Sequence, residues 1–366
     1  MAHRGVHLQY TFDRSGQQGA AVQNPLFDLL SAVHENGSIQ RAADALGVSY
    51  RHCWGELKRW QEVLGEALVS WSQGHPARLT PFAERLLHAE THARARLVPH
   101  IEALRAELER VLDEALNGSV QVATVWASHD LALPALRDAA RTSQRLHLDL
   151  RFAGSMDALR ALAEGRCTVA GFHVPPLVDG AALFARQLKP LLKPGRHKLI
   201  GCTRRTQGLI VAAGNPLALQ TLADVAARPA RFVMRQPGSG TRLLTDHLLQ
   251  QAHVDPAAIA VARTEDSHAA VAAAVAGGLA DAGIGIEAAA RAHGLDFVPL
   301  ADDDYFLVCL ADALEQPPVR ALRAALKDPA WQQAVAALPG YALREPGEVL
   351  SLTRALPWWN FKNPKG

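Results

Sequence analysis

The chain has 366 residues, of which 49% are hydrophobic and 20% are charged, and its formal net charge at pH 7 is +2. This length predicts two or three domains with packed cores, and the composition excludes a disordered chain and a uniformly basic protein. Any affinity for nucleic acid must therefore be local. The four cysteines, Cys53, Cys167, Cys202 and Cys309, form no CxxC pair, which argues against a zinc site or a disulfide framework and favours a reducing compartment.

The beginning of the chain lacks the apolar run of a signal peptide, and no segment is long and apolar enough to span a bilayer. We therefore expect a cytoplasmic protein with no membrane partner. Residues 1–24 are polar and rich in glycine and glutamine without hydrophobic periodicity, which predicts a flexible tail.

Residues 25–81 have the pattern of three short helices followed by a two-stranded wing. Pro25 fits the first turn of a helix, Ser38 can cap the second helix, Gly47 can end it, and Ser49 can cap the third. Two short apolar runs around a break rich in glycine and proline then predict a hairpin. The segment is therefore expected to be a winged helix-turn-helix.

The exposed positions of this segment carry hydrogen-bond donors. In DNA-binding units of this kind the third helix enters the major groove, and the residues in its first turns reach the base edges. A basic wing can contact phosphate. We therefore predict contacts with double-stranded operator DNA from Ser38, Gln40, Ser49, Tyr50, Arg51, His52, Trp54, Lys58, His75 and Arg78.

Residues 82–118 keep apolar side chains at near-heptad spacing with Arg and Glu between them, which predicts a long linker helix. Such a stripe suits a homodimer or homotetramer through residues 82–117, although it could instead pack on its own domain. Pro99 should kink or split the helix. Paired heads could then occupy half-sites about one helical turn apart on DNA.

Residues 119–345 alternate strands with helices, which predicts an α/β region of two lobes with a cleft. Residues 346–366 form a C-terminal tail, in which Trp358, Trp359 and Phe361 are expected to dock on the body or on a partner subunit. The expected strands are residues 120–126, 146–152, 167–172, 199–203, 209–212, 231–234, 282–286 and 306–310.

Several of these strands end in a small hydroxyl-bearing turn that opens a helix. Ligands of open α/β sheets lie at the carboxyl ends of the strands, and the free amides at helix N-termini suit an anion. Four such turns could converge on one anion, although each alone could be an ordinary helix cap. The candidate residues are Ser128, His129, Gly154, Ser155, Arg235, Gly238, Ser239, Gly240, Thr241, Arg242, Ser267 and His268.

Other chemistry is not indicated. The sixteen histidines lack metal-ligand spacing, and the chain contains no HExxH, GxSxG or Walker-type motif. We therefore expect no metal, no cofactor and no catalytic residue. A lone histidine such as His173 is more often structural than catalytic, and the run 302–304 of three aspartates before a strand is expected to be a solvated turn.

The head and wing strongly resemble the winged helix-turn-helix of LysR-type regulators, through Gly37-Ser38, Ala42-Ala43, Leu46, Ser49, Leu57, Leu64-Gly65 and Leu79-Thr80-Pro81-Phe82. Two segments, 46–51 with Trp54 and 77–82, look still more like the molybdate-responsive ModE family. ModE proteins continue into small β-barrel domains, whereas the α/β region here is similar to type 2 periplasmic binding proteins, as in LysR regulators. The resemblance thus implies a multidomain fold: an all-α winged helix-turn-helix with a long linker helix, then a two-lobed α/β periplasmic-binding-protein-like domain.

Within the α/β region, residues 235–241 look like the anion loop of phosphate- and molybdate-binding proteins. This resemblance implies that Ser239, Gly240 and Thr241 donate to the ligand, with Ser128 and Ser155 completing its shell. Where phosphate binders have an aspartate, this chain has His173, which adds His173 to the candidate effector site and disfavours phosphate. Molybdate, tungstate, sulfate or a small carboxylate is favoured instead.

The sequence therefore predicts a homo-oligomeric transcription regulator that responds to a small anion. By the resemblance, its targets would be genes of molybdenum enzymes such as formate dehydrogenase, which makes formate a second effector candidate. The alternative is an α/β anion-binding protein or enzyme with an appended helical domain that binds protein. That alternative predicts an acid, base or nucleophile pair in the cleft, and the candidate turns offer Ser, Thr, Arg and His without a carboxylate partner at motif spacing.

Overall fold

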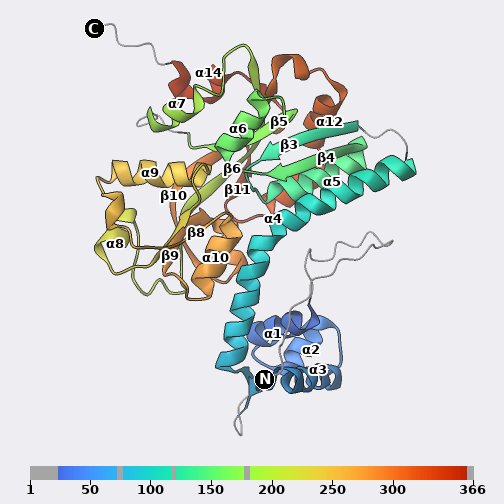
Figure 1. The fold of residues 1–366 in the computed structure, drawn as a ribbon, viewed down its shortest axis with the longest axis vertical. Helices are drawn as coiled ribbons and strands as arrows, with labels where there is room; N and C mark the ends of the chain where they lie inside the picture. Colours follow the sequence, from blue (N-terminus) through green and yellow to red (C-terminus); the bar gives the residue numbers. More distant parts are fainter. Residues whose placement is uncertain (1–23, 72–76, 118–120, 177–181, 361–366) are drawn as a thin grey trace. The chain divides into compact units, whose positions relative to one another are not determined.

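The computed structural model describes residues 24–71, 77–117, 121–176 and 182–360 (Figure 1). These residues form two compact units, one up to Arg94 and one from Ala95 onward. The division falls inside helix α4 (Pro81–Asn117), which contributes residues to both units. Each unit has its own hydrophobic core.

The first unit contains α1 (Pro25–Asn36), α2 (Ile39–Leu46) and α3 (Tyr50–Leu64), then the hairpin of β1 (Val69–Ser70) and β2 (Arg78–Leu79). The predicted caps are confirmed: the side chains of Ser38 and Ser49 accept backbone hydrogen bonds at the starts of α2 and α3. Gly47 ends α2 at a φ of 66°, a left-handed conformation that favours glycine. Local chemistry thus sets the boundaries of these helices.

The second unit is built on one ten-stranded mixed sheet. Its strands follow the order β4-β3-β5-β10-β6-β9-β7-β8, and β11 and β12 also pair with β6. The strands are β3 (Gln121–Ala127), β4 (Leu146–Phe152), β5 (Val169–Val174), β6 (His197–Val211), β7 (Phe232–Arg235), β8 (Val261–Glu265), β9 (Ala282–Ile286), β10 (Asp296–Leu310), β11 (Tyr341–Leu343) and β12 (Val349–Leu350).

The two lobes share the long antiparallel strands β6 and β10. One end of β10 pairs with β5 in the first lobe, and the far end of β6 pairs with β9 in the second. The prediction of two separate strands at 199–203 and 209–212 is wrong, because the polar residues between them continue β6. The prediction of a solvated turn at 302–304 is also wrong: these residues lie within β10, and Asp303 and Asp304 are buried.

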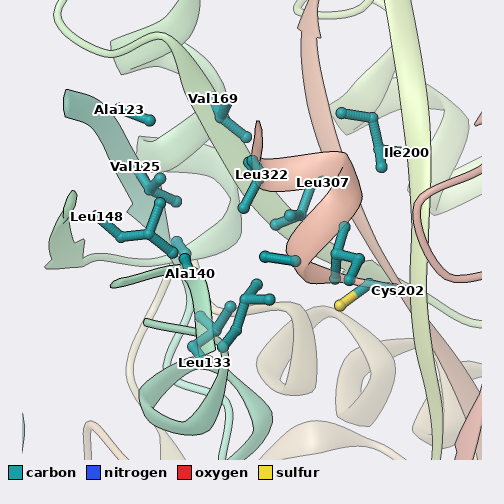
Figure 2. Packing of buried hydrophobic residues seen from close by; sticks show 14 of the residues in the cluster. Ala123, Val125, Leu133, Ala140, Leu148, Val169, Ile200, Cys202, Leu307 and Leu322 are labelled. Carbon is teal, nitrogen blue, oxygen red and sulfur yellow. The ribbon is translucent and has the colours of Figure 1, made fainter. Parts of the chain in front are cut away.

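Helices cover both lobes (Figure 1). They are α5 (Ala132–Gln144), α6 (Ser155–Ala163), α7 (Ala182–Leu188), α8 (Leu222–Ala227), α9 (Gly240–Gln251), α10 (His268–Ala276), α11 (Glu287–Ala292), α12 (Pro317–Ala325), α13 (Pro329–Ala336) and α14 (Leu352–Ala355). Figure 2 shows one core of the first lobe, where Val125 and Leu148 from the sheet lie with Leu133 of α5 and Leu322 of α12. Packing in these cores fixes the positions of the strand ends, next to which the candidate site residues lie.

Two further predictions concern the linker and the tail. Helix α4 continues through Pro99 and does not split there. Leu97, Leu104 and Val111, spaced seven residues apart, are exposed on it. At the other end of the chain, Trp358 is buried in a core of the second unit, so this part of the predicted tail docks on the body, whereas Phe361 lies outside the described residues. No helix among the described residues is both long and apolar enough to cross a membrane.

Candidate functional site

The predicted DNA-contacting residues of the first unit fall into two groups. In the first group, the side chains form hydrogen bonds within their own helices or at the helix starts. Ser38 Oγ accepts from the Arg41 amide at 3.2 Å, and Ser49 Oγ accepts from the His52 amide at 3.1 Å. The side chain of Gln40 donates to Asp44 at 2.9 Å.

The second group is exposed and available to a partner. Tyr50, Arg51, His52 and Lys58 are exposed on α3, and Arg78 is exposed on β2. Among the described residues, neither arginine makes an ion pair. Trp54 is half-buried, with its ring 4.8 Å from that of Trp71 and the Lys58 ammonium 5.8 Å above it. The remaining predicted residue, His75, lies outside the described residues.

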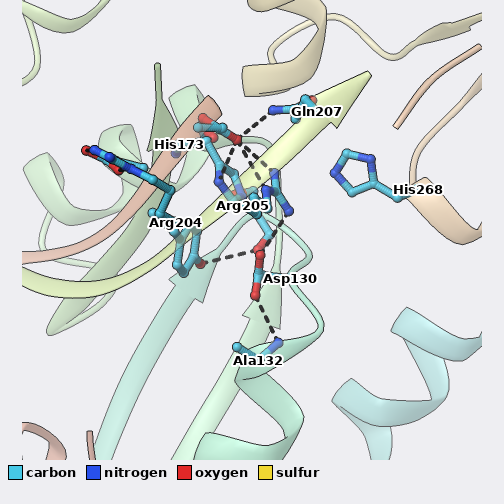
Figure 3. A network of polar contacts seen from close by, with 12 residues as sticks. Asp130, Ala132, His173, Arg204, Arg205, Gln207 and His268 are labelled. Carbon is cyan, nitrogen blue, oxygen red and sulfur yellow. Dashed lines mark hydrogen bonds and ion pairs between the residues drawn. The ribbon is translucent and has the colours of Figure 1, made fainter. Parts of the chain in front are cut away.

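In the second unit, a buried charged cluster lies where β6 and β10 cross from one lobe to the other (Figure 3). The Arg205 side chain is 1% exposed and donates to Asp130 at 2.9 Å and to Asp303 at 3.2 Å. Gln207 donates to Asp303 at 2.5 Å, and the Tyr341 hydroxyl donates to Asp130 at 3.0 Å. The protein's own donors therefore hold both carboxylates.

His173 extends this cluster into the cleft. Its Nδ1 lies 3.2 Å from Asp303 Oδ2, and its ring lies 4.2 Å from that of Tyr305. Its Nε2 is buried without a hydrogen-bond partner among the described residues. The hydroxyl of Ser128 is likewise buried and unpartnered, while the Ser128 carbonyl accepts from Tyr305 at 3.3 Å. Two polar groups are thus free to bind a ligand.

Arg235, at the end of β7, supplies the second buried cation. It donates to the carbonyls of Glu265 and Asp266 at 3.2 and 2.7 Å and lies 3.1 Å from Nδ1 of His268. Among the described residues, no carboxylate forms an ion pair with Arg235. His268 opens α10, which Ser267 caps by accepting from the Ala270 amide at 3.1 Å. This side of the cleft thus carries a positive charge without a direct counter-ion.

The turns that open α6 and α9 meet across the cleft. A Cβ on Gly154 would lie 2.8 Å from the Gly238 carbonyl oxygen, and a Cβ on Gly240 would lie 3.1 Å from that of His173. Side chains at these glycines would therefore hold the turns apart. Ser155 Oγ accepts from the His173 amide at 3.4 Å, which ties the start of α6 to β5.

Ser239, Thr241 and Arg242 follow in the α9 turn. Ser239 caps α9 by accepting from the Arg242 amide at 3.1 Å, and it donates to the Gln236 carbonyl at 2.9 Å. Thr241 is buried, whereas the Arg242 side chain pairs along its own helix with Asp246 at 2.9 Å. The structure thus brings the predicted turns together, but the Arg242 guanidinium is engaged with Asp246.

Burial controls the protonation of the cleft. It lowers the pKa of His129 to about 4 and also lowers the pKa values of His173 and His268. Burial lowers the pKa of Arg235 to about 10, so the guanidinium stays charged at neutral pH. The pKa of the Asp303 carboxyl is below its ordinary value: burial opposes ionisation, but His173 and Arg205 outweigh it. At neutral pH the cleft thus combines neutral imidazoles with charged arginines.

A cavity of about 520 Å³ lies beside these turns and reaches the residues that precede them, Ala153 and Gln236. One wall is α4, through Pro99, His100, Ala103, Leu104 and Glu107. The other walls include His129 and Phe152 of the first lobe and Gln236 and Asp266 of the second. Among the described residues, no group of three or more His, Cys, Asp or Glu side chains could hold a metal ion.

Sequence reasoning missed the residues that organise the cleft: Asp130, Arg205, Gln207, Asp303 and Tyr341. No carboxylate partner at motif spacing was found for the candidate turns, but the fold brings Asp130 and Asp303 next to them. The available signal was the pair Arg204-Arg205 and the aspartate run 302–304, each flanked by apolar segments. Two oppositely charged runs in one sheet can face each other on neighbouring strands.

Two family models match the chain. Residues 136–327 match the family model of the PBP superfamily domain, and this range is more than half of the chain. Residues 26–84 match the bacterial regulatory helix-turn-helix protein, lysR family. The first match lies within the second unit, and the second match lies within the first unit.

Relatives of known sequence cover part of the chain. The uncharacterized protein YvgK of Bacillus subtilis (strain 168) is 30% identical over 201 residues, 55% of this chain and 64% of YvgK. The chain thus spans less than two thirds of the length of YvgK. The molybdenum-pterin-binding protein MopB of Rhodobacter capsulatus is 25% identical over 215 residues, 57% of this chain and 74% of MopB.

Solved structures of similar chains include OxyR of Corynebacterium glutamicum, with 18% identity and a TM-score of 0.43 over 85% of this chain and 93% of OxyR. CbnR, a LysR family transcriptional regulator, has 18% identity and a TM-score of 0.39 over 82% of this chain and 98% of CbnR. With TM-scores this low, the family assignment depends on the two sequence models.

Proposed function

We propose that this chain, which belongs to the PBP superfamily and is a regulator of the LysR type, controls transcription in response to a small anion bound between its two lobes. The first unit would bind operator DNA, and the second would bind the effector. The single observation that carries the proposal is that Arg235, His173, His268 and the α6 and α9 turns are buried close together where the two lobes meet.

The cleft chemistry supports an anion. Arg235 is a buried cation without a direct carboxylate partner among the described residues, and a bound anion would supply that partner. Ser128 Oγ is buried and unpartnered and could donate to the ligand. His173 Nε2 is also buried and unpartnered, and it could donate once the imidazole is protonated, because Nδ1 already faces the Asp303 carboxylate. The starts of α6 and α9 add backbone amides with a favourable helix dipole.

The arrangement also bears on the class of anion. Asp130 and Asp303 accept hydrogen bonds from Arg205, Gln207 and Tyr341, so their carboxylates serve the protein's own donors. A ligand with an acidic proton therefore has little to gain from them. This favours molybdate, tungstate or formate over phosphate, and the name of MopB, a molybdenum-pterin-binding protein, points to molybdenum chemistry.

The exposed face of α3 supports the DNA-binding role. Arg51 and Lys58 are exposed on the helix that follows the turn, and Arg78 is exposed on the wing. One head with so few base-reading donors should bind weakly by itself. We therefore propose a homodimer or homotetramer through residues 82–117, with effector binding changing how the heads are presented to operator DNA. Genes of molybdenum enzymes such as formate dehydrogenase are the proposed targets.

Calorimetry would test the anion site. The purified chain would be titrated with molybdate, tungstate, sulfate, phosphate and formate, beside the Arg235→Lys variant. We expect the wild type to bind molybdate or formate, and Arg235→Lys to bind at least tenfold more weakly, because lysine cannot reproduce the planar guanidinium fork. The matched control is Arg231→Lys, since Arg231 pairs with Asp281 at the surface. Binding of none of these anions would contradict the proposal.

Operator binding would test the head. The wild type would first select a duplex from random DNA, and the affinities of Arg51→Ala and Arg78→Ala for that duplex would then be measured at several salt concentrations. Loss of a phosphate contact should weaken binding and reduce the slope of log K against log salt by about 1. Arg59→Ala is the control, since Arg59 pairs with Glu56 on the same helix. Unchanged affinity and slope in both variants would refute the assignment.

A further inference from the structure

Helix α4 is attached to the second lobe at the start of α10. The Ser267 hydroxyl lies 3.5 Å from the Ala95 carbonyl oxygen and donates to it. Ala95 packs against Ala270 and Ala273 of α10. One residue further along α4, Arg96 Nε lies 3.6 Å from Oε2 of the buried Glu265. These contacts all lie within the second unit.

The attachment points are the residues that also hold Arg235. The carbonyls of Glu265 and Asp266 accept its guanidinium, and Ser267 precedes His268, whose ring contacts it. The segment 265–268 therefore faces Arg235 with its backbone carbonyls and an imidazole. The side chains of Glu265 and Ser267 face α4. A shift of Arg235 toward a bound anion would therefore displace this segment.

The same helix is attached to the first lobe. Glu102 pairs at 2.7 Å with Arg137 of α5, a side chain that is 4% exposed. Glu102 is the sixth residue after Arg96, about 9 Å further along the helix. Pro99 lies between these contacts and lacks the amide that would close the helical hydrogen bond there. Any change in the angle between the lobes must therefore strain one contact or bend α4 near Pro99.

Given the anion site proposed above, we infer that Arg96 and Ser267 couple that site to helix α4, so that anion binding at Arg235 repositions residues 95–107. Arg96 is a positioning residue, since it acts through Glu265. The cavity between α4 and the effector turns, lined by Pro99, Ala103 and Gln236, gives the helix room to move toward the cleft.

The test measures the coupling between the two ligands. Affinity for the selected operator duplex would be measured with and without saturating sodium molybdate, or sodium formate if the wild type binds formate instead. The chains compared are the wild type, Arg96→Gln and Arg96→Lys. The control is Arg94→Gln, because Arg94 pairs with Glu90 on its own helix at 3.4 Å. Arg96 is 56% exposed, so these variants should fold.

We expect the anion to change operator affinity in the wild type, within the range of about 5- to 150-fold usual for allosteric coupling. Arg96→Gln should keep anion affinity within about threefold of the wild type and reduce the coupling factor at least threefold. Arg96→Lys should restore part of the coupling, and Arg94→Gln should retain it. If Arg96 had only a structural role, Arg96→Gln would alter the stability of the chain, and it would not reduce the coupling while leaving anion affinity unchanged.

Hydrogen exchange of the wild type provides a second measurement. Adding the anion should change the exchange of amides 95–103, and this change should disappear in Arg96→Gln. Normal anion binding with unchanged coupling in Arg96→Gln would overturn the inference alone. A wild type that binds none of the probe anions would overturn the proposed anion site and, with it, the coupling role.

Discussion

Replacing Arg205 by methionine would leave two buried carboxylates without their guanidinium. Asp130 and Asp303 are each at most 1% exposed, and Arg205 donates to both. Methionine fills a similar volume but donates no hydrogen bond and carries no charge. The change should therefore destabilise the second unit strongly while preserving its packing.

The structure sets the size of this effect. Removing one partner of a buried ion pair costs about 3–5 kcal/mol, because the remaining charge stays desolvated. For a unit of this size that is roughly a 10 °C decrease in the melting temperature. The pKa of Asp303 is lowered in the folded wild type, so its carboxylate stabilises the fold at neutral pH, and that stability is lost only as pH falls through the folded pKa. In the variant the same carboxyl should have a raised pKa. The loss of unfolding free energy caused by Arg205→Met should therefore become smaller as the pH decreases toward 5.

The matched control is Arg204→Met, on the neighbouring residue of the same strand. Arg204 is 37% exposed, and its partner Asp304 keeps a second arginine, Arg344, at 3.4 Å. That change should cost clearly less than Arg205→Met, because Arg344 still pairs with Asp304. Urea denaturation at pH 7.5 and 5, followed by circular dichroism, would measure both variants. The reasoning is refuted if Arg205→Met costs less than 1 kcal/mol at pH 7.5, or costs the same at both pH values.

Three further outcomes are expected. Gly154→Ala should keep the α6 and α9 turns apart and weaken anion binding at least tenfold in calorimetry, whereas Gly55→Ala, whose added Cβ meets nothing within 4 Å, should leave it unchanged; equal affinities would contradict the closed-cleft geometry. Anion affinity should rise as pH falls from 8 to 6, because a bound anion raises the lowered pKa values of His173 and His268; titrations in two buffers of different ionisation enthalpy should show proton uptake, and its absence would rule out this linkage. Val111→Glu should dissociate the oligomer in sedimentation experiments because Val111 is exposed on α4, and an unchanged mass would exclude this face as the interface.

Local chemistry made the head and several strands predictable. Ser38, Gly47 and Ser49 mark helix boundaries because a cap is decided by residues within one turn. The strands at 146–152 and 282–286 have the predicted bounds, since the first alternates apolar and polar residues and the second is a short apolar run. The hydroxyl-bearing turns were visible for the same reason. The sequence therefore indicated both the helix-turn-helix and the turns at which we propose that an anion binds.

Only the tertiary structure decided which charged side chains lie together in the cleft. The register of β6 and β10 places Arg205 opposite Asp303, 98 residues later in the chain. From the sequence alone, a run of aspartates is expected to lie in water, because burying an unpaired carboxylate is costly. Pairing with a distant arginine removes that cost. The contacts of α4 with Glu265 and Ser267 also join residues far apart in sequence, so the coupling that we propose between the anion site and the helix could not be inferred from the sequence alone.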